Sequence, residues 1–164
     1  MASSSGAISG GALPAPLLPF VETLPVETVV SERLAGLLER VPAHDWCHWE
    51  GVLADVPLAA LTPAIRFDPR GPTRCVIART DEAEIVVSGW LPGQGARFGE
   101  IDGRARILTG QGVEEGFALE RKVWPGDLLT LAPGTRLRNA GAGMMVVLEL
   151  RTPSEQPSGF PASS

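Results

Sequence analysis

The sequence has no tyrosine and only two histidines, His44 and His48, among its 164 residues. Cysteine is as rare: Cys47 and Cys75 form no CxxC pair, which argues against a disulfide framework. Two thiols in a reducing cytoplasm, or at most a single bridge, are compatible with this pattern. Apolar runs reach only about five residues, whereas a transmembrane helix needs about 20. The sequence therefore argues against both a disulfide-rich scaffold and a helical membrane protein.

Basic residues are also fewer than acidic ones. The chain carries 14 Lys and Arg residues against 19 Asp and Glu, for a net charge of -5. Nucleic-acid-binding domains and proteins that bind anionic membranes usually present a basic face. The segment 1–20 lacks the basic start of a signal peptide, and prolines interrupt its apolar part. We therefore expect a cytoplasmic protein whose partner is a small molecule rather than a nucleic acid or a membrane.

The sequence does contain an ordinary proportion of core-forming residues, with 44% hydrophobic and 20% charged side chains. This length and composition predict one domain with a hydrophobic core. Residues 1–18 and 153–164 are rich in Ser, Gly, Ala and Pro, which predicts a disordered N-terminal tail and a flexible C-terminal tail. Between the tails we expect a helical segment at 19–65 and a β-barrel at 66–152.

The region before the barrel shows helical periodicity. From Pro25 to Val41, valines and leucines recur three or four positions apart while the charged residues face elsewhere, which predicts an amphipathic helix. A second, shorter helix is expected over Trp49–Leu61, in a region that several prolines interrupt.

From Thr73 onwards, short runs of β-branched or alternating residues replace the helical pattern. Glycine or proline separates nearly all of these runs, as expected for turns between strands. Several short strands at this spacing predict an all-β sandwich or barrel. The predicted strands are Thr73–Ala78, Glu84–Trp90, Arg104–Leu108, Phe117–Val123, Asp127–Leu131 and Met145–Leu150.

The segment Gly89–Gly95 reads GWLPGQG and resembles the segment before the first metal motif of bacterial cysteine dioxygenase-like proteins, which are cupins. Further pieces resemble that family in the same order, at 66–69, 72–74, 124–127 and 133–141. The resemblance extends over 66–153, roughly half of the chain. It implies a single cupin-type barrel, a double-stranded β-helix or jelly roll, preceded by short N-terminal helices.

The residues that hold iron in that family are absent from the matching positions. The resemblance places two of the three histidine ligands at Gly99 and Ile101, and the third at Thr135. Neither glycine nor isoleucine has a donor atom, whereas a thiol dioxygenase needs imidazoles to hold Fe(II). Both histidines of the chain also precede the barrel. We therefore predict no metal and no other cofactor in the barrel.

Two charged residues near the end of the barrel fall at functional positions of the family. The resemblance places Arg151 at a tyrosine and Glu149 at a nearby histidine, both facing inward. Alternate residues of a strand share a face, so the two side chains point the same way. Buried charges of opposite sign must pair. They form either a structural ion pair or a general acid–base carboxylate beside a cation that stabilises negative charge.

Three more residues complete the predicted substrate site. Arg74 falls at the arginine that binds the substrate carboxylate in the family, and the alternative is an ordinary salt bridge. Glu100 is either a carboxylate at the pocket mouth or a solvated turn residue. Trp90 either forms the floor of the pocket or is a core aromatic.

Metal-ligating residue types also cluster before the barrel. On a helix, His44 and His48 would share a face, as in some zinc sites. The spacing of further ligands matches no known motif, and Trp46 and Trp49 indicate packing against the barrel instead. The cluster comprises His44, Asp45, Cys47, His48 and Glu50.

These features predict a metal-independent small-molecule enzyme of the isomerase, lyase or cyclase type, as found in specialised metabolism. Glu149 and Arg151 would be catalytic, and Arg74, Trp90 and Glu100 would bind a substrate inside an apolar barrel. The assignment rests partly on analogy, because a fold does not determine its chemistry. The alternatives are a non-catalytic ligand-binding or accessory subunit and a thiol dioxygenase with an atypical metal site. A homodimer is also compatible with the sequence.

Overall fold

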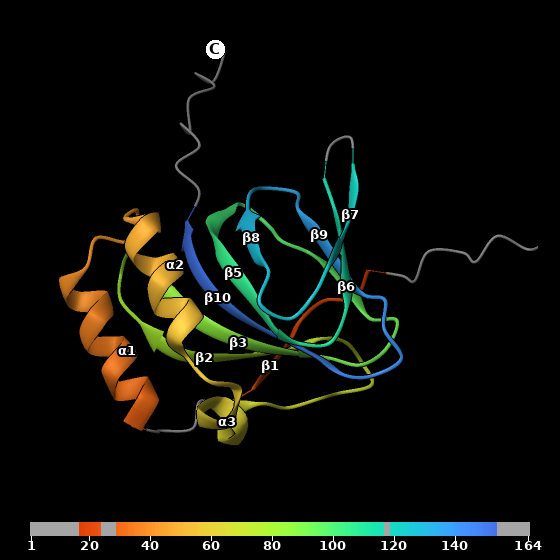
Figure 1. Ribbon diagram of the computed structural model, residues 1–164, viewed down its shortest axis with the longest axis horizontal. Helices are drawn as coiled ribbons and strands as arrows, with labels where there is room; N and C mark the ends of the chain where they lie inside the picture. Colours follow the sequence, from red (N-terminus) through yellow and green to blue (C-terminus); the bar gives the residue numbers. More distant parts are fainter. Residues whose placement is uncertain (1–16, 24–28, 117–118, 154–164) are drawn as a thin grey trace, which may run out of the picture.

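Two β-sheets face each other in the computed structural model, and short helices cover the outer side of the larger sheet (Figure 1). The structure describes residues 17–23, 29–116 and 119–153. The elements in chain order are β1 (Val21–Thr23), α1 (Val29–Arg40), α2 (Trp46–Asp55), α3 (Leu58–Leu61), a 3-10 turn (Thr62–Ala64), β2 (Thr73–Arg79), β3 (Glu84–Trp90), β4 (Gly95–Arg97), β5 (Ile101–Thr109), β6 (Gly112–Glu115), β7 (Glu120–Val123), β8 (Leu128–Leu131), β9 (Arg136–Asn139) and β10 (Met145–Pro153).

Strand β10 is central to the larger sheet, whose order is β1-β2-β3-β10-β5-β8. It pairs antiparallel with β3 on one side and with β5 on the other, while β1 pairs in parallel with β2 and forms the edge of the sheet. The smaller sheet has the order β4-β9-β6-β7 and is antiparallel throughout. Because directly opposed residues share a face, this register decides which side chains meet inside the barrel.

Apolar side chains fill the space between the two sheets. Trp90, Phe98, Met145 and Val147 are completely buried there. Burial of a large apolar side chain contributes about 1.5–3 kcal/mol, so this layer is a major source of stability. In this respect the structure differs from the expected substrate-holding apolar barrel, since these side chains form a packed core.

A second apolar layer joins the helices to the outer face of the larger sheet. Leu34 and Leu38 of α1 and Trp49 and Leu53 of α2 are buried in it. The sheet contributes residues that alternate with the inward-facing ones, namely Cys75, Ile85, Val87, Val146, Leu148 and Leu150.

Two arginines of β5 face these helices. Arg104 lies 3.0 Å from a carboxylate oxygen of Glu50 and stacks 4.6 Å from the centre of the Trp46 ring. Arg106 donates hydrogen bonds to the carbonyls of Leu53 and Ala54 at the end of α2. Both side chains therefore belong to the helix–sheet junction and not to the barrel interior.

The helical prediction was correct in type and inexact in its boundaries. α1 is described from Val29, and the predicted start at Pro25 lies outside the described residues. The single helix expected over 49–61 is wrong, because the structure has α2 and α3 separated at Pro57, whose ring cannot continue a helix. α2 begins earlier than predicted, since Asp45 caps it by accepting a 3.2 Å hydrogen bond from the His48 amide.

Most of the predicted strands are present. The strand expected over 117–123 begins at Glu120, and residues 117–118 lie outside the described residues. The strands β1, β4, β6 and β9, each of three or four residues, were not predicted. The tails predicted at 1–18 and 153–164 fall mostly outside the described residues, although Leu18 donates a backbone hydrogen bond to Gly95.

No helix among the described residues combines the length and apolarity that a membrane crossing requires.

Candidate functional site

Polar side chains gather inside the barrel where β2, β3 and β10 run side by side. Glu84 of β3 stands opposite Arg151 of β10, and Ser88 of β3 stands opposite Arg74 of β2. Glu149 shares the inward face of β10 with Arg151. Five charged or polar residues from three adjacent strands thus meet at one side of the apolar core.

Glu149 is completely buried, and its carboxylate ends a short chain of hydrogen bonds. The indole Nε1 of Trp90 donates to Ser88 Oγ at 2.9 Å, and Ser88 Oγ donates to Glu149 Oε1 at 2.9 Å. The bond between Trp90 and Ser88 can run in only this direction, because an indole N–H is a donor and never an acceptor. Trp90 therefore acts as a buried donor and does not line an open pocket.

The second oxygen of Glu149 is less well satisfied. Glu149 Oε2 lies 3.3 Å from Arg151 Nε, which is ion-pair distance, but the two atoms are poorly aligned for a hydrogen bond. Neither atom has another hydrogen-bond partner among the described residues. The Arg151 guanidinium is also held by aromatic faces, 5.4 Å from the centre of the Phe98 ring and 5.8 Å from that of Phe20.

Glu84 contacts three arginines near the end of the barrel. Its Oε1 contacts Arg74 Nη2 and lies 3.7 Å from Arg151 Nη1. Its Oε2 accepts hydrogen bonds from Arg79 Nε at 3.0 Å and Nη2 at 2.7 Å. Arg74 Nη1 also donates to Glu22 of β1 at 3.2 Å. The positive charges are therefore shared between Glu84, Glu149 and the more exposed Glu22.

Burial shifts the protonation equilibria of this cluster. Desolvation raises the pKa of Glu149, and the nearby Arg151, the Ser88 hydrogen bond and Arg74 oppose the rise without cancelling it. Desolvation is also the main reason why the pKa of Arg74 is lowered, followed by repulsion from Arg151. Glu149 therefore holds its proton to a higher pH than an ordinary glutamate does.

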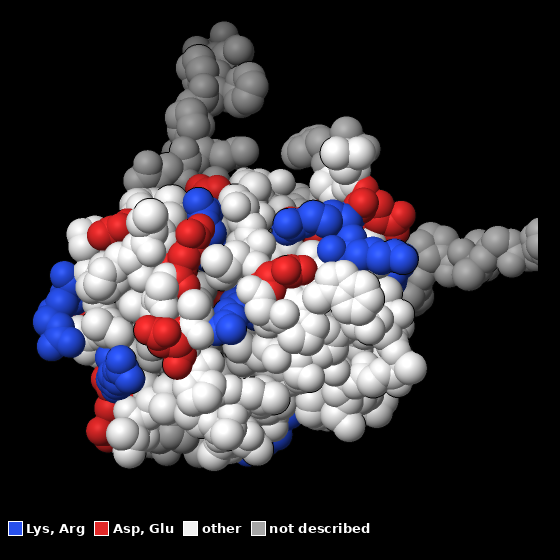
Figure 2. Space-filling model, viewed as in Figure 1, with Lys and Arg blue, Asp and Glu red and all other residues white. Residues whose placement is uncertain are grey.

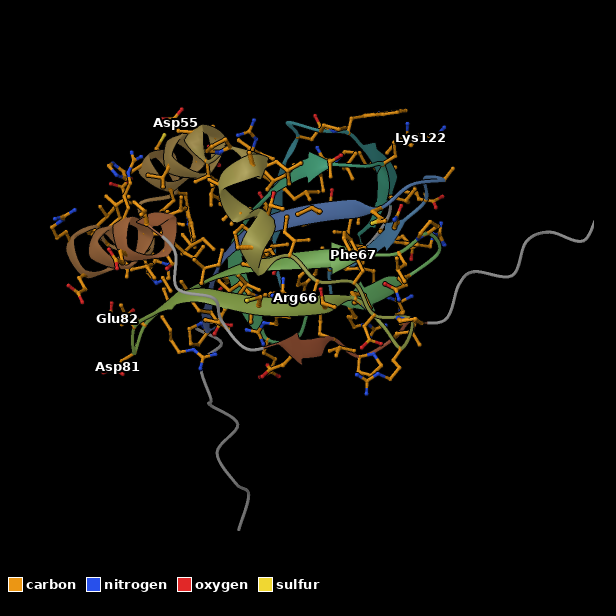
Figure 3. The ribbon with its side chains drawn as sticks, turned by 90° about the horizontal axis from the view of Figure 1, so that it is seen from below. Asp55, Arg66, Phe67, Asp81, Glu82 and Lys122 are labelled. Atoms are coloured by element: carbon orange, nitrogen blue, oxygen red, sulfur yellow. The ribbon has the colours of Figure 1, made fainter. Side chains whose placement is uncertain are left out.

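A pocket of about 370 Å³ opens beside the cluster, and we refer to it as the mouth pocket. Arg151, Glu84 and Glu100 line it, whereas Glu149 does not. Asp81 and Glu82 form its outer edge at the tip of the β2–β3 hairpin (Figure 3). Arg151 is thus the residue that touches both the pocket and the buried carboxylate.

The structure brings the predicted site residues together in two groups. Glu149, Arg151, Arg74 and Trp90 all belong to the buried cluster. Glu100 is exposed and lines the mouth pocket, where it shares the lining with Arg151.

Sequence reasoning missed Ser88 and Glu84. Both lie on the predicted strand 84–90 at even spacing from Trp90, so strand alternation already assigned them to the same face as that residue. The missing information was the pairing of β3 with β10, which places Glu84 opposite Arg151.

The upstream cluster lies away from the barrel interior. His44, Cys47 and His48 are exposed on α2 or in the loop before it, beyond the outer face of the larger sheet. Within the part of the chain that the structure describes, no group of three or more His, Cys, Asp or Glu side chains is arranged to hold a metal ion.

The positions at which the sequence resemblance predicted metal ligands do not fit a three-histidine iron centre. Gly99 has no side chain to ligate with, and Ile101 has only a hydrocarbon one. The hydroxyl oxygen of Thr135 accepts a 3.1 Å hydrogen bond from the Ala132 amide. Iron in such sites requires imidazole or carboxylate donors, which these positions do not supply.

Comparison with known proteins shows the fold and nothing more specific. No protein-family model matches the chain, and no curated protein matches it in sequence. The solved structure of the protein TT1209 from Thermus thermophilus is 20% identical, with 57% of this chain and 94% of that chain covered and a TM-score of 0.52. A conserved protein with a double-stranded β-helix domain from Klebsiella pneumoniae is 19% identical, with 58% and 88% covered and a TM-score of 0.52. The chain therefore has the double-stranded β-helix, or cupin, fold.

Proposed function

We propose that this chain is a metal-independent enzyme that performs acid–base chemistry on a small molecule bound in the mouth pocket. One observation carries the proposal: the entirely buried Glu149 has its Oε2 against Arg151, the residue that lines that pocket. Enzymes often use carboxyl groups whose pKa burial has raised as general acids and bases near neutral pH. Such chemistry is of the isomerase, lyase or cyclase type.

Arg151 supplies the positive charge that this chemistry needs. A carboxylate or enolate oxygen in the pocket would compete with Glu149 for the guanidinium, which binds such oxygens through two parallel N–H groups. Because Arg151 lowers the pKa of Glu149, a ligand that drew Arg151 away would raise that pKa further. Ligand binding and proton affinity at Glu149 are therefore coupled.

A proton transfer beside a carbonyl group fits this arrangement. Glu149 as a base removes the proton from the carbon next to the carbonyl, and Arg151 balances the negative charge on the enolate oxygen. The protonated carboxyl then returns the proton to another atom of the substrate, which gives an isomer. Alternatively, it gives the proton to a leaving group that departs with the electron pair of its bond to carbon, which gives an elimination product. Both outcomes are balanced without an oxidant or a reductant.

A non-catalytic ligand-binding module is the second candidate, and one observation favours it. Glu149 does not line the mouth pocket, and Arg151 is itself only 6% exposed. A ligand that touches Arg151 would reach the carboxylate only after this arginine moves. A binding module needs no such movement, whereas the proposed enzyme does.

The proposal is tested by hydrogen–deuterium exchange into simple keto acids. Wild-type protein and the E149Q variant are incubated with pyruvate, 2-oxobutyrate and acetoacetate in deuterium oxide, and proton NMR follows exchange beside the carbonyl. We expect wild type to accelerate exchange in at least one acid, and E149Q to lose about 10²- to 10⁴-fold of that acceleration. The matched control is E39Q, which changes an exposed glutamate of α1.

Equal exchange rates for wild type and E149Q would contradict the acid–base role of Glu149. A keto acid that raises the Tm of wild type but undergoes no exchange would instead favour the binding module.

A further inference from the structure

A second pocket lies on the smaller sheet and has a different charge character from the mouth pocket. It has a volume of about 530 Å³ and lies between Arg97 at the end of β4, Arg136 at the start of β9, Glu115 at the end of β6 and the turn 132–135. The two pockets share no lining residue. Basic side chains are visible over the β6, β7 and β9 region, with acidic side chains beside them (Figure 2).

Arg97 and Arg136 are direct partners in the β4–β9 ladder, so their side chains project from the same face of the sheet. The Cβ atoms of such partners are about 5 Å apart, and like charges in this position destabilise a sheet. Neither guanidinium forms an ion pair or a hydrogen bond with any residue in the described ranges 17–23, 29–116 and 119–153.

Nearby carboxylates do not relieve this repulsion. Glu115 of β6 stands opposite Arg136 in the ladder, but its carboxylate pairs with Arg138 at 3.5 Å. Glu120 of β7 also pairs with Arg138, at 3.4 Å. Both acids on this face therefore pair with Arg138, and the pocket, which Glu115 also lines, keeps an excess of positive charge from Arg97 and Arg136.

The other strand arginines behave differently. Each of them contacts a carboxylate or, for one residue, backbone carbonyls; they are Arg74, Arg79, Arg104, Arg106, Arg121, Arg138 and Arg151. Arg97 and Arg136 are thus exceptional among the arginines of the described strands, and they lie together on the wall of one pocket.

We propose that this pocket binds the phosphate group of a small organic phosphate monoester. Two guanidiniums carry the charge that a phosphate dianion needs, and each can bind two of its oxygens in parallel. Thr135 offers a further donor, because its oxygen accepts from the Ala132 amide and its hydroxyl hydrogen has no acceptor among the described residues. The Pro133-Gly134 turn provides a surface for the organic part, and Gly134 is open on its outer side.

Calorimetric titration with glycerol 3-phosphate at low ionic strength tests the proposal, with glycerol and inorganic phosphate as comparison ligands. We expect binding of glycerol 3-phosphate, weakened by added salt. R97Q and R136Q should each weaken it about 10- to 100-fold, the loss expected for one charge-assisted contact. K122Q is the control, because it removes the same charge from the exposed Lys122 of β7 (Figure 3).

A stability measurement separates a binding role from a structural one. In phosphate-free buffer, R136Q should leave the Tm unchanged or raise it, because it removes one member of a repelling pair. The proposal is overturned if glycerol 3-phosphate fails to bind wild type at up to about 10 mM, or binds the R97Q/R136Q double variant as tightly as wild type. It is also overturned if R136Q lowers the Tm without affecting binding.

Discussion

Arg151 stands directly opposite Glu84 in the β3–β10 ladder, with 3.7 Å between its Nη1 and Glu84 Oε1. The same arginine lies 3.3 Å from Glu149 Oε2 through its Nε. One guanidinium therefore bridges a carboxylate at the edge of the mouth pocket and a carboxylate inside the barrel. Substitutions in this cluster should have unequal effects, because the two carboxylates differ in burial and in alternative partners.

Loss of Arg151 should destabilise the fold more than loss of Arg79, another arginine that contacts Glu84. R151M leaves Glu149 completely buried without a neighbouring ion-pair partner, and removal of one member of a buried pair costs about 3–5 kcal/mol. R79M is the control, since it removes an exposed partner of Glu84 and should cost no more than about 1 kcal/mol. Urea denaturation monitored by tryptophan fluorescence measures both losses. Equal losses would show that Arg151 does not compensate the buried charge.

The stability of the protein should depend on pH through Glu149. Its pKa is raised in the folded state above the ordinary value of 4.5, so the folded chain binds more protons than the unfolded chain just above that pH. The contribution of Glu149 is therefore complete below pH 4.5 and is lost as the pH rises through the folded-state pKa. E149Q lacks this loss, so the Tm of wild type relative to E149Q should fall with rising pH. Parallel Tm profiles would contradict the raised pKa.

Ser88 connects two buried polar atoms, and its loss should affect both. S88A leaves Glu149 Oε1 and Trp90 Nε1 without the partner that each now has, at a cost of about 1–3 kcal/mol for each unsatisfied group. Because the Ser88 hydrogen bond lowers the pKa of Glu149, S88A should also move the pH at which stability is lost upward. If S88A lowers stability but loses it at the same pH as wild type, the Ser88 hydroxyl does not stabilise the Glu149 carboxylate.

The end of α2 should depend on Arg106. This side chain donates to the carbonyls of Leu53 and Ala54, which no later helical turn can satisfy. R106M should cost about 1–3 kcal/mol and increase amide exchange in the last turn of α2, with α1 unaffected. Hydrogen-exchange mass spectrometry resolves the two helices. Unchanged amide exchange in α2 would mean that water satisfies these carbonyls as well as Arg106 does.

Iron content separates the proposed function from a thiol dioxygenase with an atypical metal site. Because Gly99 and Ile101 offer no donor atoms, we expect elemental analysis of the purified protein to find iron far below one equivalent. Treatment with EDTA should leave the Tm unchanged. Near-stoichiometric iron, lost together with stability on chelation, would overturn the metal-independent assignment.

The shared face of Glu149 and Arg151 on β10 was predictable because strand alternation is local, whereas the inward direction of that face came from the family resemblance. Glu149 and Arg151 had to share a face once the run 145–150 was assigned as a strand. The partners of these residues were not predictable in the same way. Ser88 and Glu84 reach them only through the pairing of β3 with β10, between residues about 60 positions apart in the chain.

The helical region also has one feature that the local sequence predicted and one that depends on tertiary contacts. The apolar spacing of α1 predicted a buried face, and Leu34 and Leu38 are buried as that spacing required. No local pattern indicated that Arg104 and Arg106 would meet α2, because that contact depends on which face of the larger sheet the helices cover. The arginine pair of the second pocket was likewise not predictable, since it depends on the pairing of β4 with β9, two strands that are distant in the sequence.

The amino-acid sequence by itself determined that residues 66–152 contain no histidine and that a carboxylate and a guanidinium would share one face of the last strand. Tertiary structure decided that Arg151 lies between that carboxylate and the mouth pocket, that large apolar side chains fill the space between the sheets, and that Arg97 is set against Arg136. The physical reason is separation along the sequence. Strand alternation depends only on neighbouring residues, whereas strand register, packing and charge pairing depend on strands that meet only in the folded chain.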